Sequence, residues 1–258
     1  MGAYDFSHIP ELTKEEKKSP YARFYYEPIL PPASEVLAAI QPEKEMDTTL
    51  ALPPQDVKKL FVPGSLKAFN GYCVLPDGTG FSIIHTRGPE ITLEMEKWWS
   101  TWFLSSDYNY LNYKIWMPSL HFTHAMPIWE DLGWGPVKLH MIKQVKTDDW
   151  DLPASPRELN PDFYKLNGSP FKIVPDAPGE APYYATLMHY MTLGKNGLDV
   201  LTCVWSGIHI IDGQPIRMIG QKERVNREYV RLFACHNAWE FARMVRLLPG
   251  LYAHSQTL

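Results

Sequence analysis

The amino-acid sequence predicts an α+β fold in which a curved antiparallel sheet wraps around one long C-terminal helix and encloses a cavity. Strand-like runs separated by turn signals follow one another from residue 71 to about residue 220, and a helical pattern then covers 225–248. The chain has 258 residues, of which 45% are hydrophobic, so it can bury a large core. Aromatic residues make up 13% of the chain, which suits a pocket for a flat, apolar ligand.

The N-terminal part differs in composition from the rest. Residues 1–65 are rich in proline and charge, and we expect an arm with short helices at SEVLAAI and PQDVKKLF. The main domain is then expected over 66–258. The proline-rich stretch at 20–35 is placed to reach a second subunit, and a homodimer is the assembly that it suggests.

A hairpin and a helix are predicted at the start of the main domain. Two β-prone runs, 71–75 and 80–86, flank the turn sequence PDGT. Thr92 then suits the N-cap of a helix with acidic residues in its first turn. Three tryptophans and one methionine follow at the spacing of a helix that buries one face: Met95, Trp98, Trp99 and Trp102.

The rest of the main domain reads as strands followed by the long helix. We expect strands in YKIW, VKLHMIKQV, YYATLMHYMTL, DVLTCVWSGIHIIDG and IRMIG, with a hairpin at LGKNG. Together they predict a meander of antiparallel strands. The helix at 225–248 is expected to stop at Pro249 and Gly250.

Several classes of protein are excluded by composition. The formal charge is only -4 and no basic block is present, which argues against a nucleic-acid partner. No apolar run approaches the ~18–20 residues of a membrane helix, and the first residues do not resemble a secretory signal. Cys73, Cys203 and Cys235 form no paired spacing, which fits a reducing interior and predicts a cytoplasmic location.

The candidate chemistry rests on histidines predicted to point inward. His121 follows YKIWMPSL, His189 lies in LMHYM, and His236 stands four positions before Glu240 on one face of the long helix. Two or three histidines with a carboxylate can form a zinc-type or iron-type site that keeps a position open for water. Taken singly, each such histidine is more often a hydrogen-bonded core or surface residue than a ligand.

Four blocks of sequence carry a resemblance to a known family. FNGYCVLPDGTGF, EITLEMEKWWSTW, NYKIWMPSLH and CHNAWEFARMVRLLPGLYA occur in the order and rough spacing of the 2,4-diacetylphloroglucinol hydrolase family, which includes phloretin hydrolase. The resemblance covers about residues 66–253. It implies a Bet v 1-like helix-grip fold and a zinc-dependent cleavage of the carbon–carbon bond between an acyl group and a polyhydroxylated ring.

The resemblance also implies roles for single residues. The metal ligands of the family correspond to His121 from the sheet side and to His236 and Glu240 from the helix. Tyr113 resembles the tyrosine that contacts a ring hydroxyl, and His189 resembles a histidine of the strand pair around GKNG. Tyr113 and His189 are therefore the expected acid–base groups.

Three positions depart from the family pattern. Gln144 falls where the family has a fourth ligand, a glutamate, and its neutral amide would bind a zinc ion more weakly or lose it. Met117 replaces a common histidine, and Val204 occupies the position of a second substrate-facing tyrosine. The pocket becomes more apolar, which predicts a small apolar aromatic or polyketide-like substrate other than a small phloroglucinol.

Three functions remain open from the sequence. The first is a metal-assisted hydrolase of aryl ketones, of the retro-Claisen type, in secondary metabolism. The second is a metal-independent cyclase, dehydratase or pericyclase that shapes a polyketide or terpenoid chain in the same aromatic cavity. The third is a ligand carrier, because a fold by itself does not fix a reaction. Metal content, and whether the product gains the mass of water, would separate them.

Overall fold

The computed structural model describes residues 9–62, 64–103, 107–118, 140–145, 169–173, 183–194, 196–211 and 214–258. The described α-helices are α1 (Ser34–Ala39), α2 (Leu93–Phe103), α3 (Asp107–Trp116) and α6 (Arg227–Ser255). Short 3-10 helices are η1 (Glu16–Lys18), η2 (Ala22–Tyr26), η3 (Thr48–Leu50) and η4 (Pro54–Phe61). The strands are β1 (Gly71–Val74), β2 (Gly80–Gly88), β3 (His140–Val145), β4 (Ser169–Ile173), β5 (Tyr183–Gly194), β6 (Gly197–Ser206), β7 (Ile208–Ile211) and β8 (Gln214–Arg217).

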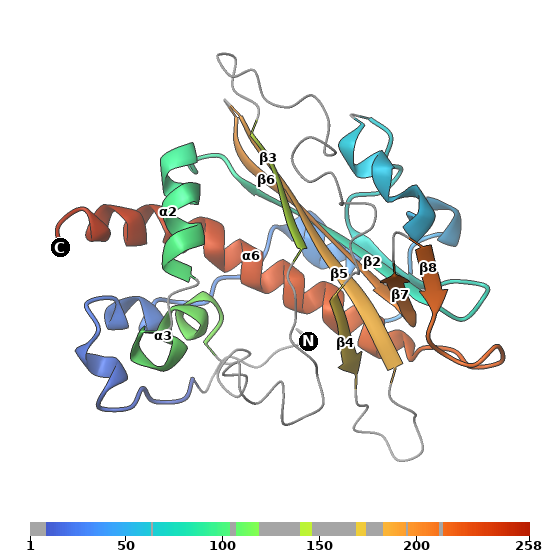
Figure 1. Ribbon diagram of the computed structural model, residues 1–258, viewed down its shortest axis with the longest axis horizontal. Coiled ribbons are helices and arrows are strands. Elements are labelled where there is room, and N and C mark those ends of the chain that lie inside the picture. Colours follow the sequence, from blue (N-terminus) through green and yellow to red (C-terminus); the bar gives the residue numbers. More distant parts are fainter. Residues whose placement is uncertain are drawn as a thin grey trace.

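The main sheet has six strands in the order β1-β2-β6-β5-β3, with β4 also paired to β5. Both predicted hairpins are confirmed. β1 pairs antiparallel with β2 across the PDGT turn, and β5 pairs antiparallel with β6 so that Gly194 faces Gly197. The predicted α+β class is therefore confirmed, with helices packed against a largely antiparallel sheet (Figure 1).

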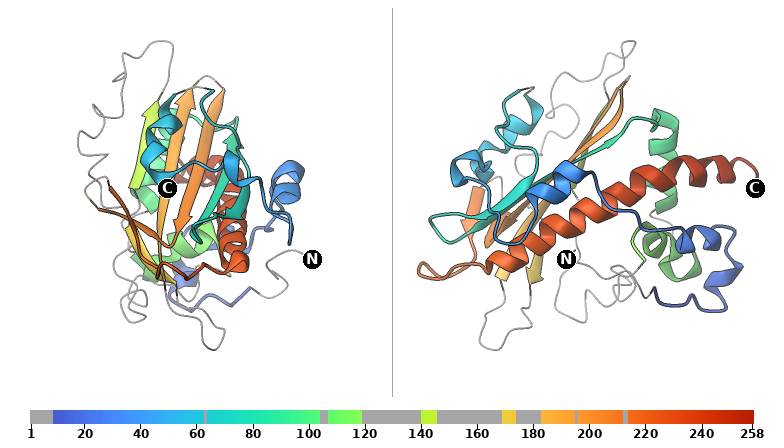
Figure 2. Two further views of the ribbon diagram at one scale, coloured as in Figure 1. Left: turned by 90° about the vertical axis from the view of Figure 1, so that its right-hand side faces the viewer. Right: turned by 180° about the vertical axis from the view of Figure 1, so that it is seen from behind.

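Different elements pack against the two faces of the sheet. The long helix α6 crosses one face, as the views from the side and from behind show (Figure 2). Side chains alternate between faces along a strand, and Ile84 and Val204 pack toward Ala234 and Ala238 of α6. The opposite face packs against the η3–η4 region, which supplies Leu52, Val57 and Leu60. The sheet is thus buried on both sides.

The helix α6 runs through the residues expected to end it. Asn226 caps its start, because the side-chain oxygen accepts a hydrogen bond from the Glu228 amide. The predicted stop at Pro249 was wrong, since the helix continues to Ser255 with the proline inside it. Burial of Leu248 and Leu251, on either side of the proline, against the core holds the last turns in place and outweighs the missing amide donor.

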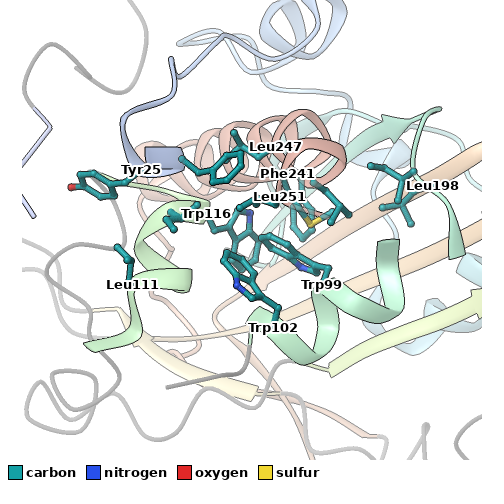
Figure 3. Packing of buried hydrophobic residues seen from close by; sticks show 14 of the residues in the cluster. Tyr25, Trp99, Trp102, Leu111, Trp116, Leu198, Phe241, Leu247 and Leu251 are labelled. Atoms are coloured by element: carbon teal, nitrogen blue, oxygen red, sulfur yellow. The ribbon is translucent and has the colours of Figure 1, made fainter. Parts of the chain in front are cut away.

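The predicted strand at YKIW was also wrong, because these residues form the last turn of α3. Leu111 and Ile115 are both fully buried, and their spacing is that of one helix face. A run of four residues is too short to distinguish a helix from a strand. Trp116, at the end of α3, packs between Trp99 of α2 and Phe241 of α6 (Figure 3).

The sheet departs from an all-antiparallel meander at one place. β3 runs parallel to β5, with His140 beside Met188 and Val145 beside Leu193. Side-chain alternation is the same in parallel and antiparallel strands, so the sequence pattern carries no signal for direction. β4 had no counterpart among the predicted strands, and Gly207, with a φ of 80°, divides the predicted long strand into β6 and β7.

The N-terminal arm packs into the core. Phe24 and Tyr25 belong to the cluster around Trp116, Val36 and Ile40 to the cluster under α6, and Leu52 to the cluster on the opposite face. The short helix predicted at SEVLAAI is confirmed as α1, and PQDVKKLF forms the 3-10 helix η4. The boundary at residue 65 stays a prediction. Within the described ranges, no helix has the length and hydropathy needed to cross a membrane.

Candidate functional site

The helix α6 presents the predicted pair of metal ligands. His236 and Glu240 are one turn apart, and Nε2 of the imidazole lies 3.2 Å from Oε2 of the carboxylate. The Glu240 side chain is 5% exposed, whereas that of His236 is 30% exposed. A carboxylate this deeply buried requires a cation, a metal ion or hydrogen-bond donors beside it. Glu240 therefore points its carboxyl group into the interior, with the His236 imidazole beside it.

His189 lies across from α6, on β5. The hairpin register sets it opposite Thr202 of β6, and its Nδ1 is 2.9 Å from the threonine hydroxyl oxygen. Its ring also meets the Phe241 ring of α6 edge to face, with centroids 4.8 Å apart. The imidazole is thereby fixed on two sides, by a hydrogen bond from the sheet and by an aromatic ring from the helix.

Burial decides the protonation state of His189. Burial lowers the pKa of His189 to about 4, while the charge of Glu240 acts to raise this pKa and that of His236 to lower it. The three groups are therefore within electrostatic reach of one another. Because a neutral imidazole carries one lone pair, His189 can accept a proton at neutral pH.

Tyr113 comes from the third element of the site, the helix α3. Burial raises the pKa of the Tyr113 phenol above its usual range, and the charge of Glu240 raises it further. The phenol therefore stays protonated at any physiological pH and serves as a hydrogen-bond donor. Its ring stands edge-on to Trp116, with centroids 6.2 Å apart.

The structure thus brings His189, Tyr113, His236 and Glu240 together from three elements. His121 lies outside the described residues. For Gln144 the structure describes the backbone, which pairs with Thr192 on β5, so its role stays a prediction.

The two apolar residues that differ from the family pattern, Met117 and Val204, are buried. Met117 follows α3 directly and is fully buried, and Val204 lies in the cluster under α6. Both positions carry an apolar group where the family resemblance would place a polar one.

Two side chains of α6 are of the kinds that bind zinc in proteins. Among the described residues, no group of three or more His, Cys, Asp or Glu side chains is placed to hold a metal ion. The pair of His236 and Glu240 offers one imidazole nitrogen and one carboxylate oxygen, both common zinc ligands. Asn237, which follows His236 on α6, is also buried, and neither its side-chain oxygen nor its side-chain nitrogen is hydrogen-bonded to a described residue. Both atoms are therefore available to bind a polar ligand.

Sequence reasoning missed three residues of this region. Thr202 could have been found, because a two-residue loop at GKNG fixes the register that sets it beside His189. Trp116 donates its indole N–H to the main-chain carbonyl of Glu240 at 2.8 Å. Arg243 donates from Nε to the main-chain carbonyl of Ile115 at 3.1 Å. The last two bonds join elements far apart in the chain and leave no local sequence signal.

A separate groove lies at the edge of the sheet. It has a volume of about 660 Å³ and is lined by the arm, the end of β2 and the second half of α6, including Glu35, Asn70, Arg87 and Arg246. Among the described residues, none of the predicted site residues lines it. The groove is therefore distinct from the cluster around His189 and Glu240.

Comparison with known proteins shows which hydrolases the chain is similar to. Residues 52–140 match the family model described as the DAPG hydrolase PhiG domain. The chain is 26% identical over 276 residues to phloretin hydrolase of Eubacterium ramulus, an alignment that covers 95% of this chain and 93% of that protein. It is 22% identical over 268 residues to 2,4-diacetylphloroglucinol hydrolase of Pseudomonas protegens, covering 92% of this chain and 84% of that protein. The chain is therefore similar to phloretin hydrolase and to 2,4-diacetylphloroglucinol hydrolases.

This similarity confirms the resemblance drawn from the four sequence blocks. The region matched by the family model contains β1, β2, α2 and α3, and hence Tyr113. A second 2,4-diacetylphloroglucinol hydrolase, from a Pseudomonas species, is also 22% identical and is covered over 88% of its length. The similarity to these hydrolases therefore extends over nearly the whole chain and is not confined to one motif.

Proposed function

We propose that this protein is a hydrolase that cleaves the carbon–carbon bond between an acyl group and a polyhydroxylated aromatic ring. The similarity to phloretin hydrolase over nearly the full length of both chains carries this proposal. Water supplies a hydroxyl group to the acyl carbon and a proton to the ring carbon that it leaves. The products are one carboxylic acid and one deacylated ring.

The described residues suit the proton transfers of this reaction. The ring carbon leaves with the electrons of the broken bond, so it must receive a proton. His189 is neutral at neutral pH and can accept a proton from a ring hydroxyl or from water. Tyr113 keeps its proton and can donate a hydrogen bond to a ring hydroxyl or to the acyl oxygen. Removing a ring-hydroxyl proton gives a phenolate, whose acyl-bearing carbon can accept a proton to form the keto tautomer. When the carbon–carbon bond of this tautomer breaks, its electrons move onto the ring oxygen.

We propose further that His121, His236 and Glu240 hold a zinc ion, with Gln144 in place of a fourth, charged ligand. When bound, zinc polarises a carbonyl oxygen or lowers the pKa of a water molecule. The imidazole and carboxylate on one turn of α6 support this assignment. With one anionic ligand in place of two, we expect the ion to be held more weakly than by two histidines and two glutamates.

The remaining features belong to the same proposal. The path of α6 across one face of the sheet supports a Bet v 1-like helix-grip fold. Met117 and Val204 favour a small apolar aromatic substrate over a strongly polar one. The buried, unpaired Cys73, Cys203 and Cys235 suit a reducing, cytoplasmic location. A homodimer and a role in secondary metabolism also stay proposals.

The test is product analysis with purified protein and acyl phenols. Phloretin and 2,4-diacetylphloroglucinol are incubated separately with zinc-loaded wild-type protein and with the Glu240→Gln variant, and products are measured by mass spectrometry. We expect a carboxylic acid and a deacylated ring from the wild type and at least a ~100-fold slower reaction from the variant. An isomer of the substrate would support the cyclase alternative, and an unchanged but tightly bound ligand would support a carrier.

A further inference from the structure

Two helices that carry predicted site residues, α3 and α6, are joined by a reciprocal pair of hydrogen bonds. The indole Nε1–H of Trp116 donates to the main-chain carbonyl of Glu240 at 2.8 Å. In the opposite direction, Nε–H of Arg243 donates to the main-chain carbonyl of Ile115 at 3.1 Å. Because each helix supplies one side chain and one carbonyl, the helices cannot slide or rotate against each other without lengthening a bond.

Arg243 also closes the ends of two helical segments. Ile115 lies in the last turn of α3, where carbonyls lack an intrahelical donor. The Nη2 group of Arg243 donates to the carbonyls of Phe24 and Tyr25, in the 3-10 helix η2, at 3.0 and 3.3 Å. Its Nη1 group donates to the carbonyls of Glu27 and Pro28 at 2.8 and 3.2 Å. One guanidinium therefore joins α6, α3 and the arm.

The environment of Arg243 is unusual for a charged side chain. The residue is 1% exposed, and among the described residues no carboxylate lies within ion-pair distance of it. Burial lowers the pKa of Arg243 to about 10, so it remains a cation at neutral pH. Main-chain carbonyls at helix C-termini carry partial negative charge and stabilise such a cation. A guanidinium has five N–H donors in a fixed plane, which a lysine cannot reproduce.

This connection is placed where it can set the geometry of the candidate site. Trp116 is one helical turn beyond Tyr113, and the two rings are in edge contact. Glu240 accepts the Trp116 bond at its main chain and carries the carboxylate whose charge reaches the Tyr113 phenol. Trp116 packs against Phe241 (Figure 3), and the Phe241 ring in turn contacts the His189 ring.

We propose that Trp116 and Arg243 are positioning residues that fix the Tyr113 phenol relative to the Glu240 carboxylate. The inference rests on the proposed hydrolase function. A displacement of about 1 Å at a reacting group can slow a reaction ~100-fold, so small shifts of α3 against α6 matter for turnover. The arm contributes indirectly, because its carbonyls fill the remaining N–H groups of Arg243.

Two substitutions test the proposal against a matched control. Trp116→Phe keeps an aromatic ring and removes the N–H donor, and Arg243→Lys keeps the charge and removes the planar set of donors. The control is Arg246→Ala, on the same helix. Arg246 binds the arm carbonyls of Leu30 and Pro31 at 2.7 and 2.5 Å, and among the side chains that the structure describes it makes no hydrogen bond to α3. We expect kcat to fall about 10-fold or more in the first two variants with KM within about twofold, and neither constant to move in the control.

A double-substitution cycle separates positioning from general loss of structure. If Trp116 acts through Tyr113, then Trp116→Phe has no further effect on kcat when Tyr113 is already replaced by phenylalanine. Effects that multiply in the double variant would overturn the proposal. An equal loss of kcat in Arg246→Ala would also overturn it, because packing of the arm would then explain the result.

A readout without turnover distinguishes this inference from the proposed function. The protein is labelled with 3-fluorotyrosine, and the ¹⁹F signal of position 113 is assigned by its absence in Tyr113→Phe. We expect that signal to shift in Arg243→Lys, which leaves the Trp116 ring beside Tyr113 unchanged, and to stay in place in Arg246→Ala. An unmoved signal in Arg243→Lys contradicts the positioning role even if the enzyme hydrolyses acyl phenols, and a shift there supports it even if the wild type hydrolyses none.

Discussion

Burial gives the two candidate proton-transfer residues opposite and complementary states. His189 loses its proton more readily than a histidine in water, because the charged imidazolium is disfavoured away from solvent. Tyr113 holds its proton more firmly, because the phenolate is disfavoured for the same reason. A single dry environment therefore supplies one acceptor and one donor without a change of pH. The charge of the buried Glu240 carboxylate raises the pKa values of both residues.

The stability of the protein should depend on pH through His189. Its pKa is about 4 in the folded protein, whereas the pKa of a histidine in water is 6.5, so between these pH values the unfolded chain binds more protons. The contribution of His189 to the free energy of unfolding is therefore fully present above pH 6.5 and is lost as the pH drops toward 4. The shift corresponds to roughly 3 kcal/mol. In urea titrations at several pH values, His189→Gln should show a flatter profile over this window, and a slope equal to that of the wild type would contradict the assignment.

The hydroxyl of Tyr113 should matter for turnover more than for folding. Tyr113→Phe removes only the buried hydroxyl group, and we expect kcat to fall about 100-fold, the usual scale for a lost proton-transfer or hydrogen-bonding group. The midpoint of urea unfolding should change little, because the ring packing on Trp116 is kept. Steady-state kinetics and urea titration measure the two effects. Retention of wild-type kcat would remove Tyr113 from the candidate site.

At the scale of elements, the arm and the end of α6 depend on tertiary packing. Glu16 is fully buried in η1, and its carboxylate pairs with Lys114 of α3. The backbone amide of Thr13 donates to the Glu16 carboxylate, and the Thr13 hydroxyl accepts from the Glu16 amide, which forms a reciprocal capping box. These contacts tie the first helical turn of the arm to the helix that carries Tyr113.

Breaking this buried ion pair should be costly. Lys114→Met leaves the Glu16 carboxylate buried without its cation, and we expect a loss of about 3–5 kcal/mol in the free energy of unfolding. The double variant Glu16→Leu with Lys114→Met should recover most of the loss, because apolar pairs of similar volume replace buried ion pairs well. Lys17→Met, which removes an exposed pair with Glu11, is the matched control and should change stability little. A small effect of Lys114→Met would show that the arm is only loosely attached.

The turns of α6 beyond Pro249 can be tested in the same way. Leu251 is fully buried among the residues of the arm and α3, so Leu251→Ala should cost about 2–5 kcal/mol. Leu258, which is exposed, provides the control, and Leu258→Ala should change the free energy of unfolding by less than about 0.5 kcal/mol. Equal and small effects of both substitutions would mean that the helix ends where the sequence predicted.

The errors at element scale have a common physical cause. The hairpins at PDGT and GKNG, the helix α2 and the start of α6 follow from local turn and capping signals, and all were predicted. The helical state of YKIW, the continuation through Pro249 and the direction of β3 depend on contacts with distant residues. His236 and Glu240 were placed together by helix periodicity, whereas Trp116 and Arg243 act across α3 and α6 and could not be found from spacing.

At the scale of the whole molecule, a sheet covered on both faces holds the candidate site between itself and α6. The arm reaches all three core clusters, and Trp205 donates its indole N–H to the Leu52 carbonyl on the face away from α6. The site residues come from β5, α3 and α6, so their arrangement depends on the complete fold. The near full-length similarity to phloretin hydrolase is consistent with a site assembled in this way.

The most direct test of the hydrolase assignment follows the oxygen of water. Purified wild-type protein is incubated with phloretin in H₂¹⁸O, and the products are analysed by mass spectrometry within the time of a single conversion. The proposed reaction predicts a carboxylic acid that carries one ¹⁸O atom together with a deacylated ring without ¹⁸O. Formation of a carboxylic acid with no ¹⁸O, or of an isomer that has the mass of the substrate, would contradict carbon–carbon bond hydrolysis by this protein.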